Sequence, residues 1–130
     1  MSESQRILIV SDNAGFPRAA LEQRGFAVTM GNDCDLAFEK LPGVDLLVVD
    51  FASAHEGIEL IKRVRATPQL TGILILVVAE WGTGKPALAF SAGADAYEPS
   101  EAASIDPSRL IISIERLLSR QAAAANQQIL

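Results

Sequence analysis

Four short apolar runs, and a fifth that is less apolar, recur along the chain with polar segments between them. The runs are Arg6–Val10, Phe26–Met30, Val44–Asp50, Ile73–Val78 and Ala94–Tyr97. Their length and their β-branched residues favour strands over helices. The third run contains four consecutive apolar residues without alternation. Such a run is typical of a strand that is buried on both faces near the middle of a parallel sheet.

Amphipathic segments alternate with these runs and predict helices. They are Phe16–Arg24, Asp33–Leu41, Ile58–Arg65, Pro86–Ala92 and a last helix that opens at Asp106 and Pro107. In the second segment, Asp33 is expected to cap the helix. Leu36, Ala37 and Leu41 are expected to face the core there, with Phe38 as a further candidate.

The repeated alternation of strand and helix indicates an α/β fold with a parallel sheet covered on both faces. Five strands joined by right-handed crossovers predict the doubly wound order 2-1-3-4-5, a (βα)5 flavodoxin-like sandwich. With 130 residues the chain is expected to form one domain, over residues 1–120. Residues 121–130 are rich in Ala and Gln, and are expected either to extend the last helix or to form a linker.

Two aspartates follow strands that become neighbours in this order. Asp12 comes just after the first run, and Asp50 ends the third. Ligands collect at the carboxyl edge of such a sheet, at the switch point between these two strands, so both carboxylates are expected at one site. Two carboxylates at one edge suit a hard cation such as Mg²⁺. Taken alone, Asp50 is equally compatible with a solvated strand end or a helix cap.

Composition narrows the classes of function. The net charge of −5 and the isoelectric point near 4.8 argue against a nucleic-acid-binding surface. The longest apolar run, Ile73–Ala79, is too short to span a membrane, and the N-terminal residues lack the long apolar region of a secretory signal. The single cysteine, Cys34, rules out an internal disulfide and fits a reducing compartment. We expect it to behave as a small buried hydrophobic residue.

The glycine-rich segment Ala79–Pro86 follows a strand and precedes a helix, as a phosphate-binding loop does. That type of loop needs Ser or Thr after its Lys, whereas Pro86 stands there, so we expect no nucleotide site. Trp81 within the segment is expected to be exposed and to contact a partner protein. The alternative is that Trp81 folds back over Val78 or Tyr97.

In its element order and spacing, the chain resembles the receiver domain of bacterial two-component response regulators. The resemblance extends from about Arg6 to Arg120. It is carried by Ile7–Asn13, which is similar to the family's first strand, and by Val44–Asp50, which is similar to the strand that ends in the phosphoacceptor aspartate. Gly57–Arg65 is similar to the third helix, and Ala92–Tyr97 to the Gly-Ala-x-x-Tyr segment near the fifth strand.

The resemblance implies a set of roles for individual residues. Asp50 would be the phosphoacceptor, whose carboxylate attacks a phosphoryl group and forms an acyl phosphate. Asp12 and Asp50 would bind Mg²⁺, together with the main-chain carbonyl near Ala52. The metal ion would neutralise charge on the phosphoryl oxygens. Tyr97 would be the aromatic switch residue.

The sequence departs from the family pattern at four places. Ser11 replaces the first residue of the acidic pair, which removes one negative charge. Val78 stands where a Thr or Ser hydroxyl would bind the phosphoryl group. The Lys that precedes a Pro in the family is missing, and its place is taken by Glu98 or Ser100 around Pro99. The loop of residues 51–56 lacks the usual Met-Pro and is one residue short.

Two hypotheses follow for a cytoplasmic domain that acts through protein contacts and is not an enzyme. In the first, a histidine kinase donates a phosphoryl group to Asp50 in a phosphorelay, with a weak Mg²⁺ site. In the second, a pseudo-receiver binds another signalling protein, or a second copy in a homodimer, without phosphate and through its fourth and fifth helices. An enzyme or ligand binder on the same fold is a third class. Affinity for Mg²⁺ and acyl-phosphate formation discriminate between them.

Overall fold

The computed structural model of the chain describes residues 5–11, 16–51, 54–70, 72–79, 85–98 and 107–129. Four residues with predicted roles lie outside these ranges: Asp12, Ala52, Trp81 and Ser100. Their predicted roles therefore stay predictions. Within the described residues, no helix is long and apolar enough to cross a membrane.

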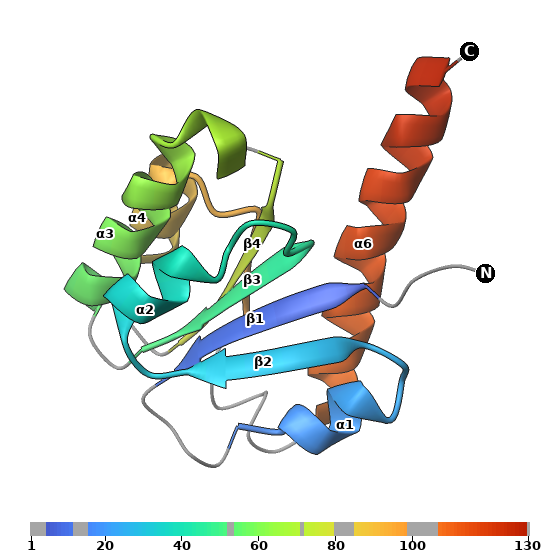
Figure 1. Cartoon of the computed structure of the whole chain (residues 1–130), viewed down its shortest axis with the longest axis horizontal. Helices are drawn as coiled ribbons and strands as arrows, with labels where there is room; N and C mark the ends of the chain where they lie inside the picture. Colours follow the sequence, from blue (N-terminus) through green and yellow to red (C-terminus); the bar gives the residue numbers. More distant parts are fainter. Residues whose placement is uncertain are drawn as a thin grey trace.

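A five-stranded sheet forms the centre of the part of the chain that the structure describes, and Figure 1 shows its strands side by side. The strands are β1 (Arg6–Ser11), β2 (Ala27–Gly31), β3 (Leu46–Asp50), β4 (Leu74–Val78) and β5 (Ala96–Glu98). They are ordered β2-β1-β3-β4-β5, and every neighbouring pair is parallel. The predicted order 2-1-3-4-5 is confirmed. All five strands end at the same edge of the sheet because all run in one direction.

Helices cover both faces of the sheet (Figure 1). They are α1 (Arg18–Glu22), α2 (Cys34–Glu39), α3 (Ala54–Arg65), α4 (Lys85–Ala92) and α6 (Pro107–Ile129), with a short 3-10 turn at Pro68–Leu70. Buried residues of α2, α3 and α4 pack on one face, and those of α1 and α6 pack on the other. The helix α6 continues through Ile129 and so includes residues after residue 120.

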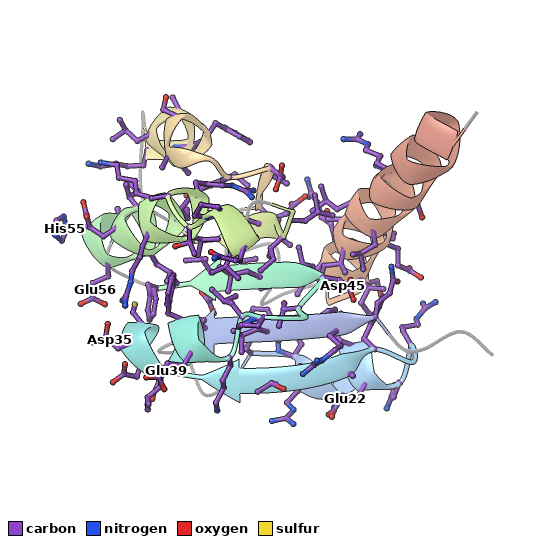
Figure 2. All side chains as sticks on the ribbon, turned by 45° about the horizontal axis from the view of Figure 1, so that its top comes forward. Glu22, Asp35, Glu39, Asp45, His55 and Glu56 are labelled. Carbon is purple, nitrogen blue, oxygen red and sulfur yellow. The ribbon has the colours of Figure 1, made fainter. Side chains whose placement is uncertain are left out.

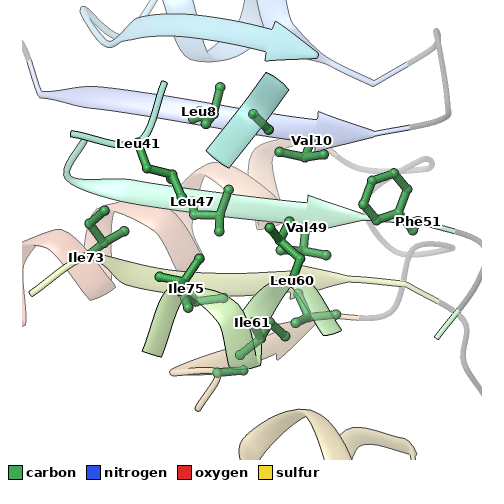
Figure 3. Packing of buried hydrophobic residues seen from close by; sticks show 14 of the residues in the cluster. Leu8, Val10, Leu41, Leu47, Val49, Phe51, Leu60, Ile61, Ile73 and Ile75 are labelled. Atoms are coloured by element: carbon green, nitrogen blue, oxygen red, sulfur yellow. The ribbon is translucent and has the colours of Figure 1, made fainter. Parts of the chain in front are cut away.

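The side chains on the two faces of each central strand belong to two separate layers of the core. In β3, Leu47 and Val49 pack toward α2 and α3, whereas Leu46 and Val48 pack toward α6. Figure 3 shows the first layer, where Leu47 and Val49 lie beside side chains of β1 and α3. All five residues of β3 are buried. Burial on both faces explains why this run is apolar without alternation.

Several predicted details were wrong. Leu36 was expected to face the core but is 59% exposed, because the inward stripe of α2 runs through Cys34, Ala37, Phe38 and Leu41 at helical spacing. Cys34 is half-buried rather than buried. Residues 54–56 were expected in a loop but form the first turn of α3. The helix predicted over residues 16–24 is shorter, at Arg18–Glu22.

The Arg65 side chain connects three segments at the edge of the sheet where the strands begin, opposite to the edge where they end. Its guanidinium donates to the carbonyl oxygens of Gly93 (2.9 Å) and Ile73 (2.8 Å), and to the Asp95 carboxylate (2.8 Å). The same Asp95 oxygen accepts a hydrogen bond from the main-chain N–H of Ile75, also at 2.8 Å. These bonds fasten the C-terminal end of α3 to the start of β4 and to the turn between α4 and β5.

Candidate functional site

The Asp50 carboxylate lies at the carboxyl end of β3, where the central strand meets the edge of the sheet. The register between β1 and β3 places Ser11 directly beside Asp50. The Ser11 hydroxyl donates a hydrogen bond to Asp50 Oδ2 at 2.8 Å. Ser11 is 4% exposed and Asp50 is 8% exposed, and among the described residues they are the polar or charged ones that are buried.

A buried carboxylate is costly unless hydrogen bonds or charges stabilise it. The Ser11 hydroxyl supplies one such bond, and both partners have further contacts. In the family pattern that the chain resembles, Ser11 stands in place of an acidic ligand. The structure adds that Ser11 is a hydrogen-bond donor to Asp50. Sequence reasoning missed this contact, although the strand order already placed the two residues on adjacent strands.

Val78 and Glu98 are neighbours across the last two strands at the same edge. Val78 is 1% exposed and packs in the core layer under α6. The Glu98 carboxylate accepts a hydrogen bond from the Ser113 hydroxyl of α6 at 2.5 Å and lies 3.9 Å from Arg109 Nε. Glu98 is one of the two residues that the resemblance places where the family has Lys. Its carboxylate is bound by side chains of α6.

Tyr97 directly precedes Glu98 on β5, and its side chain packs on the opposite face of the sheet, against the core layer that contains α4. Its phenolic hydroxyl donates to the main-chain carbonyl of Ala79, just after β4, at 2.9 Å. The main-chain N–H of Ala79 in turn donates to the carbonyl of Glu98 at 3.0 Å. The ends of β4 and β5 are therefore tied together by both side-chain and main-chain bonds.

The helices α2 and α3 begin beside this edge and enclose a groove of about 600 Å³. Cys34, His55, Glu56 and Arg63 are among its lining residues. Figure 2 shows His55 and Glu56 beyond one edge of the sheet, whereas Asp45, just before β3, lies at the opposite edge. Burial raises the pKa of the Cys34 thiol, and the Glu56 carboxylate raises it further. The groove therefore presents a protonated thiol at neutral pH.

A divalent cation at this edge would need more oxygen ligands than the described residues supply. Asp50 is the one carboxylate that the described residues bury at this edge, and Ser11 adds a neutral hydroxyl oxygen. No group of three potential metal-ligating side chains occurs among the described residues. The chemistry of this donor set fits an oxygen-ligated Mg²⁺ in type, but with fewer charges than a full acidic pair would give.

No protein-family model matches the sequence. No curated protein sequence matches it either. Solved structures do match, and the following three are response regulators or chemotaxis proteins.

A response regulator from Burkholderia multivorans is 28% identical, with a TM-score of 0.69 over 88% of this chain and 94% of that one. The chemotaxis protein CheY4 from Vibrio cholerae is 22% identical, with a TM-score of 0.75 over 87% and 98%. The phosphorylated cyanobacterial phytochrome response regulator RcpA is 18% identical, with a TM-score of 0.73 over 88% and 94%. The chain therefore has the CheY-like fold of response regulator receiver domains, as the sequence resemblance predicted.

Proposed function

We propose that this chain is a receiver module of a phosphorelay, and that it accepts a phosphoryl group from a histidine kinase on Asp50. The observation that carries the proposal is the buried Asp50 carboxylate at the carboxyl end of the central strand, next to the end of β1. Ligands and chemistry collect at this position in open α/β sheets. The module acts in the cytoplasm as a signalling protein rather than as an enzyme with a released product.

In the proposed reaction, an oxygen of the Asp50 carboxylate attacks the phosphorus atom in line with the leaving group. A bond forms between Asp50 and phosphorus while the bond to the donor breaks, and the donor leaves with the electron pair. Asp50 and Asp12 would hold Mg²⁺ together with the main-chain carbonyl near Ala52. The metal ion, when bound, neutralises charge on the phosphoryl oxygens. Because Ser11 replaces a carboxylate, this site binds Mg²⁺ weakly.

The test is incubation with acetyl phosphate and Mg²⁺, followed by intact-mass measurement. We expect one phosphoryl adduct on the wild type and none on Asp50→Asn. A matched control is Asp45→Asn. Asp45 lies at the edge of the sheet where the strands begin, opposite to Asp50, and its carboxylate accepts a hydrogen bond from the main-chain N–H of Arg6 at 2.8 Å. This variant should keep the adduct. Absence of an adduct from the wild type at high Mg²⁺ would overturn the proposal.

A second candidate function is favoured by the switch positions. Val78 offers no hydroxyl, and the Glu98 carboxylate is bound to α6 rather than available to a cation at the site. These features favour a module that binds a signalling partner or a second copy without phosphate. The fourth and fifth helices, which the hypothesis names as the interface, are α4 and α6. Each carries large apolar side chains that are about half exposed: Leu88 and Phe90 on α4, and Ile112 on α6. The two functions differ in whether phosphorylation changes binding.

A further inference from the structure

The hydrogen bond from Ser11 to Asp50 bears on how long a phosphoryl group stays on Asp50. We infer that Ser11 shortens the lifetime of the acyl phosphate by stabilising the free carboxylate more than the phosphorylated one. This inference rests on the proposed function, since it concerns the same aspartate. The Ser11 hydroxyl lies 2.8 Å from Oδ2. At that distance it is a full donor to one of the two carboxylate oxygens.

The bond from Ser11 weakens whichever Asp50 oxygen carries the phosphoryl group. If phosphorus is bonded to Oδ1, then Oδ2 becomes a neutral carbonyl oxygen. If phosphorus is bonded to Oδ2 itself, that atom becomes an ester oxygen, which is a poorer acceptor still. In both cases the acceptor loses its share of the negative charge. Hydrogen bonds to ionised acceptors are roughly twice as strong as those between neutral groups, so the bond from Ser11 weakens on phosphorylation.

Hydrolysis reverses this change. A water oxygen attacks phosphorus, the bond between phosphorus and the Asp50 oxygen breaks, and the electron pair of that bond returns to the carboxylate. The water gives up a proton as inorganic phosphate forms. Negative charge builds on the carboxylate as the bond breaks, and the bond from Ser11 strengthens with it. A donor that is aimed at developing charge in this way lowers the barrier to the step.

The strands hold the donor in place for this role. Ser11 and Asp50 are register partners on adjacent strands, and both are more than nine-tenths buried. A hydrogen bond in such a setting is electrostatically stronger than one in water and requires little reorganisation during the reaction. A carboxylate in place of Ser11 could not donate, and its charge would oppose the charge that returns to Asp50.

The test compares the wild type with Ser11→Ala and Ser11→Thr. Each protein is phosphorylated with acetyl phosphate and Mg²⁺, desalted into buffer with the same Mg²⁺, and followed by intact mass. We expect the adduct on Ser11→Ala to last about fivefold longer than on the wild type, because the donor is gone. Ser11→Thr keeps the hydroxyl and should restore a lifetime within about twofold of the wild type.

A spectroscopic measurement separates donation from a merely structural effect. With phosphorus on Oδ1, the atom that accepts from Ser11 is the carbonyl oxygen of the acyl phosphate. The infrared band of that carbonyl, identified by ¹³C labelling of aspartate, should then move to higher frequency in Ser11→Ala and return in Ser11→Thr. A change in packing alone would not follow the presence of the hydroxyl. Circular dichroism checks that each variant is folded, and Ser11→Cys, a weaker donor of similar size, takes the place of Ser11→Ala if the latter does not fold.

The outcomes are distinguishable. An adduct whose lifetime is equal or shorter in Ser11→Ala, or in Ser11→Cys where that variant replaces it, overturns the role of Ser11 and leaves the phosphoacceptor proposal standing. The absence of an adduct from the wild type and every variant overturns the phosphoacceptor proposal and the inference with it. A longer lifetime without the hydroxyl, restored by threonine, supports both.

Discussion

A raised pKa keeps the half-buried thiol of Cys34 protonated at neutral pH, in the groove between α2 and α3. Loss of solvent is the largest cause of its raised pKa, followed by the carboxylates of Glu56, Asp33 and Asp35, while Arg63 acts in the opposite direction. The thiolate is the reactive form, so a raised pKa moves alkylation to higher pH. The rate of alkylation by iodoacetamide should therefore rise at a higher pH in the folded protein than in urea.

A matched variant tests whether the Glu56 carboxylate contributes to the raised pKa of Cys34. Glu56→Gln removes the largest electrostatic contribution and should lower the pH at which alkylation rises, while the contribution of burial remains. A profile for the folded wild type that lies at or below the profile in urea would contradict the assignment of a protonated thiol.

The elements show how far the sequence determines this fold. The strands could be predicted because a buried strand requires a continuous apolar run, and few other structures require one of that length. Helix α2 was harder, because six residues give too little periodicity to fix its orientation. Leu36 fits an apolar pattern but lies about 100° around the helix from Ala37, which occupies the buried stripe. Packing on the sheet, which the sequence does not display, decided between them.

Two glycines in the turns that follow α1 and α4 give a prediction about the free energy of unfolding. Gly93 has φ of +124° and Gly25 has φ of +91°, so alanine is strained at both. A Cβ at Gly93 would lie 2.5 Å from Arg65 Cγ, whereas a Cβ at Gly25 would meet nothing within 4 Å. We expect Gly25→Ala to cost about 1–2 kcal/mol and Gly93→Ala about 2–4 kcal/mol. Urea denaturation measures both, and equal losses would show that the contact with Arg65 is not limiting.

At the scale of the whole molecule, topology predicted the strand neighbours of Asp50 better than individual residues did. The strand order follows from the alternation of strands and helices, and it brings the end of β1 next to Asp50. The direction of the Glu98 side chain could not be predicted in this way. It depends on Ser113 and Arg109, which are presented by the docking of α6, a contact between distant segments. Local sequence patterns predict where helices and strands form. Contacts between distant segments, such as those of Glu98 with α6, can be identified only in the folded structure.

The same long-range pairing would limit how strongly a phosphoryl group on Asp50 could change the molecule. A phosphoryl group adds a charge of about −1.5 to −2. Val78 offers it no donor, and Glu98 is committed to α6. A two-state element moves only as far as the difference in interaction energy between its states allows. We therefore expect the sedimentation coefficient of the wild type to change little on treatment with acetyl phosphate and Mg²⁺.

Val78→Thr combined with Ser100→Lys should increase that response, because the pair restores a hydroxyl on β4 and a cation in the segment after β5. Val78 is buried, so the new hydroxyl costs about 1–3 kcal/mol unless it finds a partner, and each single variant is needed as a control. The measurement is sedimentation velocity of treated and untreated protein at matched concentrations. A large phosphate-driven shift in the wild type would exclude the phosphate-independent module and leave a regulator that couples through other residues.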